Sequence, residues 1–482
     1  MEPIFELDLR LPEKGSRLVL RSLHEQLRTA IIEGRLKAGV RLPASRAMAQ
    51  SMKISRNTVV LAYEMLVSEG YLVTNTSAGS IVADIRPKQV KQGAKLGQEK
   101  PDRRLAPFWR DRGQKDNTSP DKPARYDFRP GYPDMSLFPF DVWRRLTTRA
   151  ARAESKLPVL EGESQGLLSL RKAIAGHVSY ARAVACSPDD IVVTSGFRQA
   201  VDLLARVMIV PGETQVALED PCYHAVQNIF ESAGARIVPV PVDDEGLVVS
   251  RLPSTVKIIC TSPSHQFPLG VTMSPGRRID LLEFANRHGA VIIEDDYDSE
   301  FRIEGRPLDA LHTLDRQNVV FYTGTFSKCL FAALRIGFVV APPWARKALI
   351  AAKQFSDAHN PILQQEMLAA FINEGHLAKH IRKMRAVYSE RHDVLIGSLQ
   401  RNCGSWLKPI PSFAGVHLAA VADQRCDIQG IAKRALNAGI RLQTFSSAAA
   451  EDKPKAGVAF GFGLIKTKDI MPAVTALAQC GP

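Results

Sequence analysis

The stretch "GTFSKCLFAALRIG", residues 324–337, places one lysine, Lys328, among small, apolar and hydroxyl-bearing residues. Burying an ammonium group in such surroundings is costly, so the lysine needs a chemical reason to be there. The hydroxyls of Thr325 and Ser327 lie close by, and the guanidinium of Arg335 follows seven residues after the lysine. Hydroxyls and a guanidinium are groups that hold a phosphate. The stretch therefore predicts an amine beside an anion-binding site.

The sequence around this stretch predicts a large α/β sheet. From residue 126 onward, short apolar runs such as "TQVALED", "AVIIEDDYD" and "NVVFYTG" alternate with amphipathic helical patterns. This alternation is typical of a mainly parallel sheet with helices on both faces. The residues from 343 onward contain long helical patterns and a few strands, which predicts a smaller C-terminal α+β lobe.

Polar residues gather at the ends of the predicted strands, where open α/β sheets bind ligands. The turn at Ser195 and Phe197 leads from a strand into a helix, whose free N–H groups suit a phosphate. Asp295 and Tyr297 follow the strand "AVII", and Tyr223 follows another strand. An acid, a phenol, an aromatic ring, a lysine and a phosphate cradle together indicate pyridoxal phosphate. This cofactor forms a Schiff base with a lysine, and a carboxylate keeps its ring nitrogen protonated.

Composition limits the class of protein. The 482 residues are 45% hydrophobic and 23% charged, an ordinary balance for a globular protein of several domains. No apolar run is long enough for a membrane span, and the N-terminus lacks the apolar region of a signal peptide. The seven cysteines are widely spaced and form no CxxC pair, which predicts reduced thiols in a cytoplasm, no disulfide framework and no metal site.

The net charge of +13 is concentrated in one segment. Residues 86–125 contain twelve Lys and Arg against five Asp and Glu, and they are rich in Gln, Gly and Pro. We predict a basic, flexible linker over residues 85–125. Two interpretations stay open: a tether that is only solvated, and a tether that also contacts DNA phosphates.

The first 84 residues predict a winged helix-turn-helix domain. Helical patterns cover residues 17–34, 43–52 and 55–70, and "YLVTNTSAGSIVAD" follows with two short β-rich runs around a polar turn. The helix from residue 56 to residue 70 is the predicted recognition helix.

The first turn of that helix carries Ser55, Arg56, Asn57 and Thr58. Arg and Asn side chains can read base edges in the major groove, and a helix N-terminus attracts phosphate. By itself, this turn fits an ordinary capped surface helix equally well.

A longer motif resolves that choice. The run "GRLKAGVRLPASRAMAQSMKISRNTVVLAYEMLVSEGYLV" resembles the GntR-type winged helix along its whole length. The resemblance implies binding to a double-stranded DNA operator, with Arg46, Arg56, Asn57 and Thr58 at the positions that touch DNA. The wing, "TNTSAGS", departs from the pattern, because Ser77 stands where a glycine is common.

The segment from about residue 128 to residue 463 resembles the fold-type I aminotransferases. The whole chain resembles the MocR/GabR regulators, in which a GntR-type reader is joined to a pyridoxal phosphate domain; "TSPSHQFPLG", "EDDYDSEFR" and "GTFSK" are among the shared motifs. The resemblance implies a homodimer and gives each pocket residue a role. Lys328 would form the Schiff base, Asp295 would pair with the ring nitrogen, Tyr297 with the 3′-oxygen, and Tyr223 would stack on the ring. The phosphate would be held by Ser195, Phe197 (through its N–H), Arg198, Thr325, Ser327 and Arg335.

The chain departs from these families at three positions of the pocket. Glu161 stands where a Tyr usually reaches the partner's phosphate, and Leu269 replaces a hydroxyl-bearing residue. Ala459 stands where an Arg usually grips the α-carboxylate of a substrate, and Arg441 is a nearby candidate to replace that Arg.

These observations predict a cytoplasmic transcription regulator that senses a small amine, amino acid or related metabolite through an aldimine of pyridoxal phosphate. One alternative is a pyridoxal phosphate-dependent aminotransferase with an accessory DNA-binding domain. Ala459 argues against it, because turnover needs a substrate held firmly at two points, so any transaminase activity would be vestigial. A second alternative is a regulator whose C-terminal domain only dimerises, and the intact set around Lys328 argues against it.

Overall fold

The chain divides into two compact units, Met1–Leu105 and Ala106–Pro482, in the computed structural model. The structure describes residues 9, 11–12, 18–75, 79–84, 103–110, 124–155, 162–303, 309–412, 414–447 and 455–482. The division falls inside the predicted linker, most of which lies outside the described residues. Its described part includes a short helix, α4 (Pro107–Arg110), which begins at a proline, a residue favoured in the first turn of a helix.

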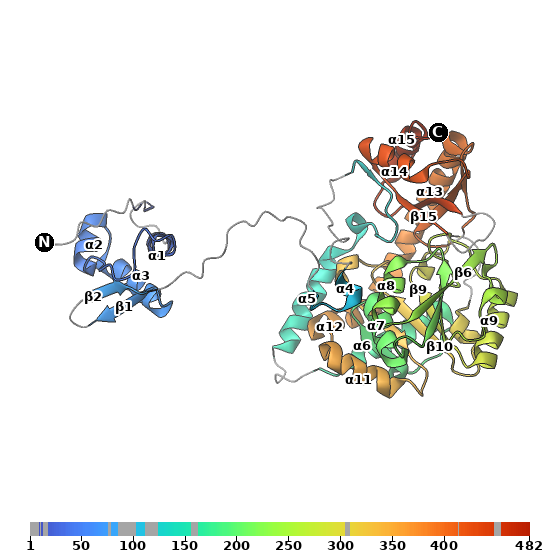
Figure 1. Cartoon of the computed structure of the whole chain (residues 1–482), viewed down its shortest axis with the longest axis horizontal. Coiled ribbons are helices and arrows are strands. Elements are labelled where there is room, and N and C mark those ends of the chain that lie inside the picture. Colours follow the sequence, from blue (N-terminus) through green and yellow to red (C-terminus); the bar gives the residue numbers. More distant parts are fainter. Residues whose placement is uncertain are drawn as a thin grey trace. The chain divides into compact units, whose positions relative to one another are not determined.

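The first unit is a three-helix winged domain, as predicted (Figure 1). It contains α1 (Val19–Ile32), α2 (Ser45–Met52), α3 (Arg56–Ser68) and an antiparallel hairpin of β1 (Leu72–Asn75) and β2 (Gly79–Val82). The helices enclose a small apolar core that includes the fully buried Leu23, Val59 and Leu66. Between α2 and α3, Lys53 adopts a left-handed backbone conformation (φ 54°), which ends α2 and lets the chain turn into α3.

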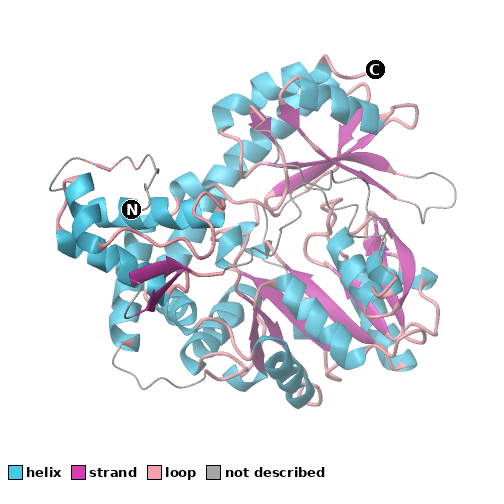
Figure 2. Ribbon diagram, turned by 60° about the vertical axis from the view of Figure 1, so that its left-hand side comes forward, coloured by secondary structure: helices cyan, strands magenta, loops and turns pink. Residues whose placement is uncertain are grey.

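The second unit is built on an eight-stranded sheet with the strand order β4-β11-β10-β9-β8-β5-β6-β7 (Figure 2). Its strands are β4 (Ile191–Thr194), β5 (Gln215–Asp220), β6 (Arg236–Asp243), β7 (Gly246–Leu247), β8 (Ile258–Thr261), β9 (Val291–Asp296), β10 (Val320–Thr325) and β11 (Gly337–Val340). The five strands from β10 to β6 are parallel, whereas β11 runs antiparallel to both β10 and β4. The predicted mainly parallel sheet is confirmed.

Helices cover both faces of this sheet because successive strand residues are buried on opposite sides. Ile258 packs in a core with α7 (Phe197–Met208), α8 (His224–Ser232) and α11 (Arg346–Asp357). Its neighbour Ile259 packs in a separate core with helices of the other face. Those helices are α9 (Pro275–His288) and α10 (Leu311–Leu314).

The remaining helices of the large domain include α5 (Phe140–Glu154), α6 (Leu168–Arg182), α12 (Ile362–Asn373) and the long α13 (His376–Cys403). They pack into one large apolar core that continues into the C-terminal lobe. No helix in the described ranges is both long enough and apolar enough to cross a membrane.

The C-terminal lobe contains an antiparallel sheet, ordered β12-β13-β16-β15, with two helices against it (Figure 1). Its elements are β12 (Leu407–Pro409), β13 (His417–Ala422), α14 (Ile428–Asn437), β15 (Gln443–Ser446), β16 (Ala456–Gly461) and α15 (Thr467–Ala478). The first strand of the unit, β3 (Tyr126–Asp127), joins this lobe by pairing with β14 (Ile440–Arg441). The predicted smaller α+β lobe is therefore present, and the start of the unit belongs to it.

The start of α3 generates a prediction. The Ser55 hydroxyl accepts a hydrogen bond from the Thr58 N–H at 3.1 Å, which caps the helix. We expect Ser55→Ala to lower the free energy of local unfolding of α3 by about 1 kcal/mol, as measured by hydrogen exchange of the α3 amides in the full chain. Ser51→Ala, at an exposed position of α2, is the control. Equal protection of α3 in both variants would contradict the capping role.

Candidate functional site

A cavity of about 380 Å³ lies beside the ends of β9 and β10 and the start of α7. Every residue that the sequence predicted for the pocket lines it, except Ser195. These residues are Phe197, Arg198, Tyr223, Asp295, Tyr297, Thr325, Ser327, Lys328 and Arg335. The fold thus gathers residues that are up to 138 positions apart in the chain, from 197 to 335.

Other lining residues were missed by the sequence reasoning. They are Pro130, Gly131, Tyr132, Phe267, Ala332, His417 and Gln443. Gly131 has a positive φ of 83°, and a Cβ at this position would lie 2.7 Å from the Lys328 Nζ atom. Only glycine fits there, and the motif "RPGYP" was the available signal for a tight turn.

The side chain of Lys328 enters the cavity, where the charge of its ammonium group is only partly balanced. Its Nζ donates a hydrogen bond to the Gly131 carbonyl at 2.9 Å. Burial lowers the pKa of Lys328, while the nearby carboxylates of Asp298 and Asp295 oppose that shift. A lysine with a lowered pKa has a larger neutral fraction, and the neutral amine is the nucleophile.

Asp295 is the second unusual group. Its Oδ1 atom is buried and has no hydrogen-bond partner among the described residues. Burial, reinforced by the charge of Asp296, raises the pKa of Asp295 well above its usual range. A buried carboxylate oxygen without a donor is rare in native proteins and indicates a missing partner, such as an N–H group of a bound molecule.

The opposite end of the cavity is suited to an anion. Helix α7 begins at Phe197 after Gly196, whose φ of 79° allows the sharp turn from β4. A Cβ on Gly196 would lie 3.2 Å from the Arg335 guanidinium, which donates to the Ser195 carbonyl at 2.7 Å. The free N–H groups of the first turn and this guanidinium form an anion-binding site. The Thr325 hydroxyl donates to Ser327 at 3.1 Å.

Ser195 lies behind this turn, outside the cavity lining. Its N–H donates to the Gln199 side chain at 2.6 Å, and its hydroxyl oxygen accepts from Asn360 at 2.9 Å. Only the hydroxyl hydrogen of Ser195 is left to serve as a donor toward a ligand. Its predicted contact with a phosphate therefore depends on that single hydrogen.

A chain of hydrogen bonds that begins at a buried lysine supports Ser195. Lys353 is fully buried, and its Nζ pairs with Asp357 at 2.5 Å. Asp357 also accepts from the Gln199 amide at 2.7 Å, and Gln199 in turn holds the Ser195 N–H. Burial lowers the pKa of Lys353, whereas Asp357 opposes that shift. Lys353 and Gln199 are thus positioning residues that the sequence did not reveal.

Tyr223 and Arg198 contact each other directly. The Arg198 guanidinium donates to the Tyr223 hydroxyl from Nε at 3.1 Å and from Nη2 at 2.6 Å. Phe267 packs edge-on against Tyr223, with 6.0 Å between ring centroids. The tyrosine that the sequence predicted to stack on a cofactor ring is thereby held from two sides.

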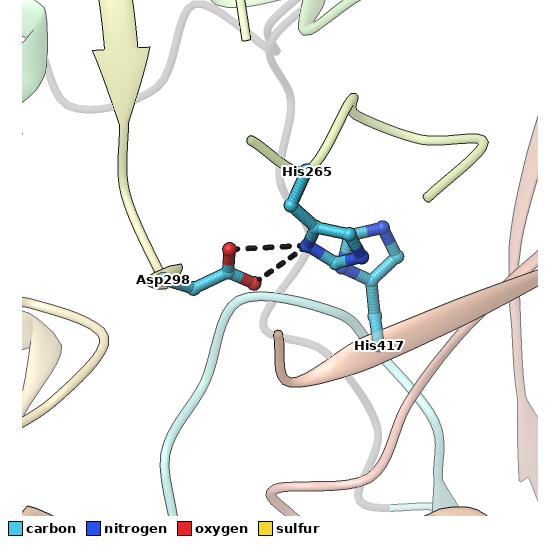
Figure 3. Close-up of side chains that lie close together, drawn as sticks. All are labelled: His265, Asp298 and His417. Carbon is cyan, nitrogen blue, oxygen red and sulfur yellow. Dashed lines mark hydrogen bonds and ion pairs between the residues drawn. The ribbon is translucent and has the colours of Figure 1, made fainter. Parts of the chain in front are cut away.

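Tyr297 contacts a buried polar cluster of His265, Asp298 and His417. Figure 3 shows the three side chains of this cluster. Its hydroxyl donates to the His265 carbonyl at 2.9 Å, and both Asp298 oxygens lie 3.0 Å from His265 Nδ1. His417 packs beside His265, with 4.5 Å between ring centroids, and burial lowers its pKa to about 3.

The donor atoms of His265, Asp298 and His417 lie within 4.8 Å of one another, a spacing compatible with metal ligation. Their contacts are those of a hydrogen-bonded group, however. Asp298 also accepts from the Val416 N–H at 3.1 Å, and a Cβ at Gly415 would lie 2.2 Å from His265. The backbone of the C-terminal lobe thus packs directly on this pair.

The positions at which the chain departs from the related families lie in different parts of the structure. Ala459 is fully buried in β16 and lines a second cavity, of about 340 Å³, which shares Arg198, Tyr223, Phe267 and Gln443 with the first. Arg441, the candidate to replace the missing Arg, is not among the residues that line either cavity. Leu269 is buried. Glu161 and Ser77 lie outside the described residues.

In the first unit, the predicted DNA-contacting residues gather around the start of α3. Arg46, Ser55 and Arg56 line one shallow depression, and Arg56 donates to the Ser45 hydroxyl at 3.4 Å. Asn57 is exposed and Thr58 is half-buried. The cluster is open to solvent, as a groove-reading surface must be.

A winged helix joined to a fold-type I sheet with a lysine-bearing pocket defines a class: DNA-binding proteins with an aminotransferase-like domain. The comparisons agree with it. Residues 21–82 match the family of bacterial regulatory proteins of the gntR family, and residues 132–446 match aminotransferase class I and II. The chain belongs to the MocR-type transcriptional regulators, which combine these two domains.

Individual relatives support this assignment. The probable rhizopine catabolism regulatory protein MocR of Rhizobium meliloti is 36% identical over 95% of this chain and 92% of its own length. The pyridoxine biosynthesis transcriptional regulator PdxR of Corynebacterium glutamicum is 30% identical over 92% of this chain and 91% of its own. Among solved structures, the kynurenine aminotransferase of Pyrococcus horikoshii, in complex with PMP, has a TM-score of 0.68 at 28% identity, covering 73% of this chain and 90% of that one.

The support beneath Ser195 generates a prediction. We expect Lys353→Met to weaken binding of pyridoxal phosphate about fivefold, the effect of about one hydrogen bond, because Asp357 loses its cation and Gln199 its anchor. Binding of pyridoxal, which lacks the phosphate, should not change. The measurement is fluorescence titration of both compounds. Lys347→Met, at an exposed position of the same helix, is the control. Equal losses for both compounds would contradict a role at the anion site.

Proposed function

We propose that this protein is a transcription regulator that binds an operator through its winged helix and senses a small amine through pyridoxal phosphate held at Lys328. The observation that supports it most strongly is the pairing of Lys328 with the unpartnered Asp295 in one cavity, in a chain that also contains a GntR-type reader. Neither feature would be needed by a domain that only dimerises.

Pyridoxal phosphate is the cofactor of the second unit, and the residues present fit it. The orphaned Asp295 oxygen suits the protonated ring nitrogen, and the first turn of α7 with Arg335 suits the phosphate dianion. Tyr223 offers its ring to the pyridine, and Tyr297 supplies the phenol that would pair with the 3′-oxygen. When bound, the cofactor supplies a carbonyl that captures primary amines.

The residues of the chain divide the sensing task among them. Lys328 provides the amine that an effector amine must displace, and its lowered pKa favours the neutral form needed for that exchange. Asp295 holds a proton at the ring nitrogen, since a buried carboxylate requires a donor. Arg335 and the α7 N-terminus anchor the phosphate and so fix where the effector lies.

Aminotransferase turnover is the second candidate, favoured by the same lysine and by the fold that the chain shares with solved aminotransferases. It requires a substrate gripped at two points. The fully buried Ala459 offers no charge for such a grip, so we place sensing first. Keto-acid formation from an amino acid at a steady rate would reverse this order.

We also propose a homodimer that acts in the cytoplasm. The support for the dimer is the exposure of large apolar side chains on the second unit, such as Phe355 at 87% and Tyr180 at 94%. The support for the compartment is the DNA-binding domain together with cysteines that are all free thiols.

Replacing the lysine tests the sensing role. We expect Lys328→Ala to lose the absorption band of lysine-bound cofactor, while operator affinity stays within about twofold, since the reader has its own core. Absorption spectroscopy and DNA-binding anisotropy measure the two properties. Lys347→Ala serves as the control. Effector-dependent transcription that persists in a protein without the band would contradict the proposal.

Replacing the recognition-helix arginine tests the DNA role. We expect Arg56→Ala to weaken binding to an operator selected from random DNA by about five- to 150-fold, the value of one good base contact of about 1–3 kcal/mol. The cofactor spectrum should not change. Arg21→Ala removes an exposed arginine of α1 and is the matched control at equal salt. An unchanged affinity for Arg56→Ala would count against this interface.

A further inference from the structure

The buried cluster in Figure 3 contains one histidine, His265, whose two ring nitrogens both face acceptors. Its Nδ1 lies 3.0 Å from each carboxylate oxygen of Asp298, and its Nε2 lies 3.2 Å from the Ser412 hydroxyl oxygen. The Ser412 hydroxyl donates its single hydrogen to the Ala414 carbonyl at 3.2 Å, so it can only accept from the ring. Nδ1 faces a carboxylate and must donate as well. These contacts give His265 two ring protons and a positive charge.

Asp298 balances the charge of this imidazolium. Both side chains are only 1% exposed, and the carboxylate also accepts from the Val416 N–H at 3.1 Å. A buried charge is tolerated where it is paired and hydrogen-bonded, and this pair meets both conditions. The neighbouring His417 is the neutral ring of the two, because burial lowers its pKa to about 3. The cluster is thus a buried imidazolium–carboxylate pair with a neutral imidazole beside it.

The same imidazolium contacts the phenol of Tyr297. The His265 Nδ1 atom lies 3.2 Å from the Tyr297 hydroxyl oxygen, so its N–H is shared between that oxygen and Asp298. The Tyr297 hydroxyl donates its own hydrogen to the His265 carbonyl at 2.9 Å. A phenol that accepts a hydrogen bond from a cation becomes a stronger donor, because linked hydrogen bonds polarise one another. Tyr297 lines the cavity that contains Lys328, so the cluster reaches that cavity through the phenol.

Most of the other titratable groups around Tyr297 are acids. They belong to the end of β9 and the segment after it, to β5, to β13 and to the segment after β10, and they are Asp295, Asp296, Asp298, Glu219, His417 and Lys328. Burial, followed by the charges of the four acids, raises the pKa of Tyr297 well above its usual range. Lys328 carries the cofactor, and His417 is neutral. Within this set of groups, His265 is the cation that donates to the phenol oxygen.

We propose that His265, charged and held by Asp298, is a positioning residue that acts on the cofactor through Tyr297. It strengthens the phenol as a donor toward the 3′-oxygen, the partner that the family resemblance gives to Tyr297. The hydrogen that Tyr297 donates to the His265 carbonyl is the one that the 3′-oxygen accepts in its place. This inference rests on the proposed function, because it requires pyridoxal phosphate at Lys328.

The strength of this donor can be measured from the absorption of the lysine-bound cofactor. A hydrogen bond to the 3′-oxygen draws negative charge away from the nearby nitrogen of Lys328 and so favours loss of the proton that the two atoms share. The absorption changes when this proton is lost, and the midpoint pH of the change therefore reports the strength of the donor. Loss of the imidazolium should move that midpoint to higher pH.

The experiment is a spectroscopic pH titration of the cofactor-loaded full chain. We expect Tyr297→Phe and His265→Asn each to raise the midpoint, the latter by about one pH unit, or about tenfold in proton affinity, the effect of roughly one charge-assisted hydrogen bond. Added to Tyr297→Phe, His265→Asn should leave the midpoint unchanged, because the phenol through which it acts is gone. His288→Asn, at a partly exposed position at the end of α9, is the control. A full shift by His265→Asn in the Tyr297→Phe protein, or no shift in either protein, would overturn the inference.

A second variant and a direct measurement separate charge from packing. Asp298→Asn is nearly isosteric and keeps an acceptor for the His265 N–H, but it removes the negative charge that stabilises the imidazolium, so we expect a shift in the same direction. Nitrogen NMR of histidine-labelled protein, assigned by difference with His265→Asn, should show two protonated ring nitrogens at neutral pH. A wild-type protein that never acquires the cofactor band would refute the proposed function itself. A normal band with a neutral His265 ring would refute only this inference.

Discussion

The second unit is organised around one costly arrangement: a lysine amine and an unpartnered carboxylate kept inside the same cavity. Burial disfavours the charged form of both Lys328 and Asp295. Each of these two groups therefore adds to the free-energy cost of a cavity without a ligand. Favourable interactions elsewhere in the unit must offset this free-energy cost. A ligand that offers a carbonyl to the amine and a ring N–H to the carboxylate relieves both penalties at once, so its binding stabilises the folded unit.

The surrounding structure holds this pair from several directions. The Gly131 carbonyl, near the start of the unit, accepts the lysine hydrogen bond, and the φ of 83° at this position favours glycine. From the C-terminal lobe, the backbone at Gly415 and Val416 packs on the Asp298–His265 pair behind Tyr297. The pocket is therefore a junction of the large sheet, the first residues of the second unit and the C-terminal lobe.

Much of this site could be predicted from the sequence because strand ends are easy to recognise. Asp295 and Thr325 lie at the ends of buried strands, and Lys328 stands out as a charge in an apolar run. The supporting residues gave no such signal. Lys353 and Asp357 look like an ordinary exposed i,i+4 pair on a helix, and only the packing of α11 on α7 reveals that the lysine is buried. Gln443 and His417 lie in a lobe whose docking no local pattern encodes.

There is a physical reason why the sequence reveals some residues of the site and not others. Groups that hold the cofactor must sit at fixed positions on the sheet, and the charge or polarity that this requires is visible locally. Other lining residues need only face the cavity, and those of the C-terminal lobe belong to a sheet separate from the one that carries the anion site at α7. Ala459 is an example, since it pairs in regular register with Ala419 and Gln443 at a position where the related families usually have an arginine. The large sheet thus positions the groups that hold the cofactor, while the small lobe adds lining residues from β13, β15 and β16.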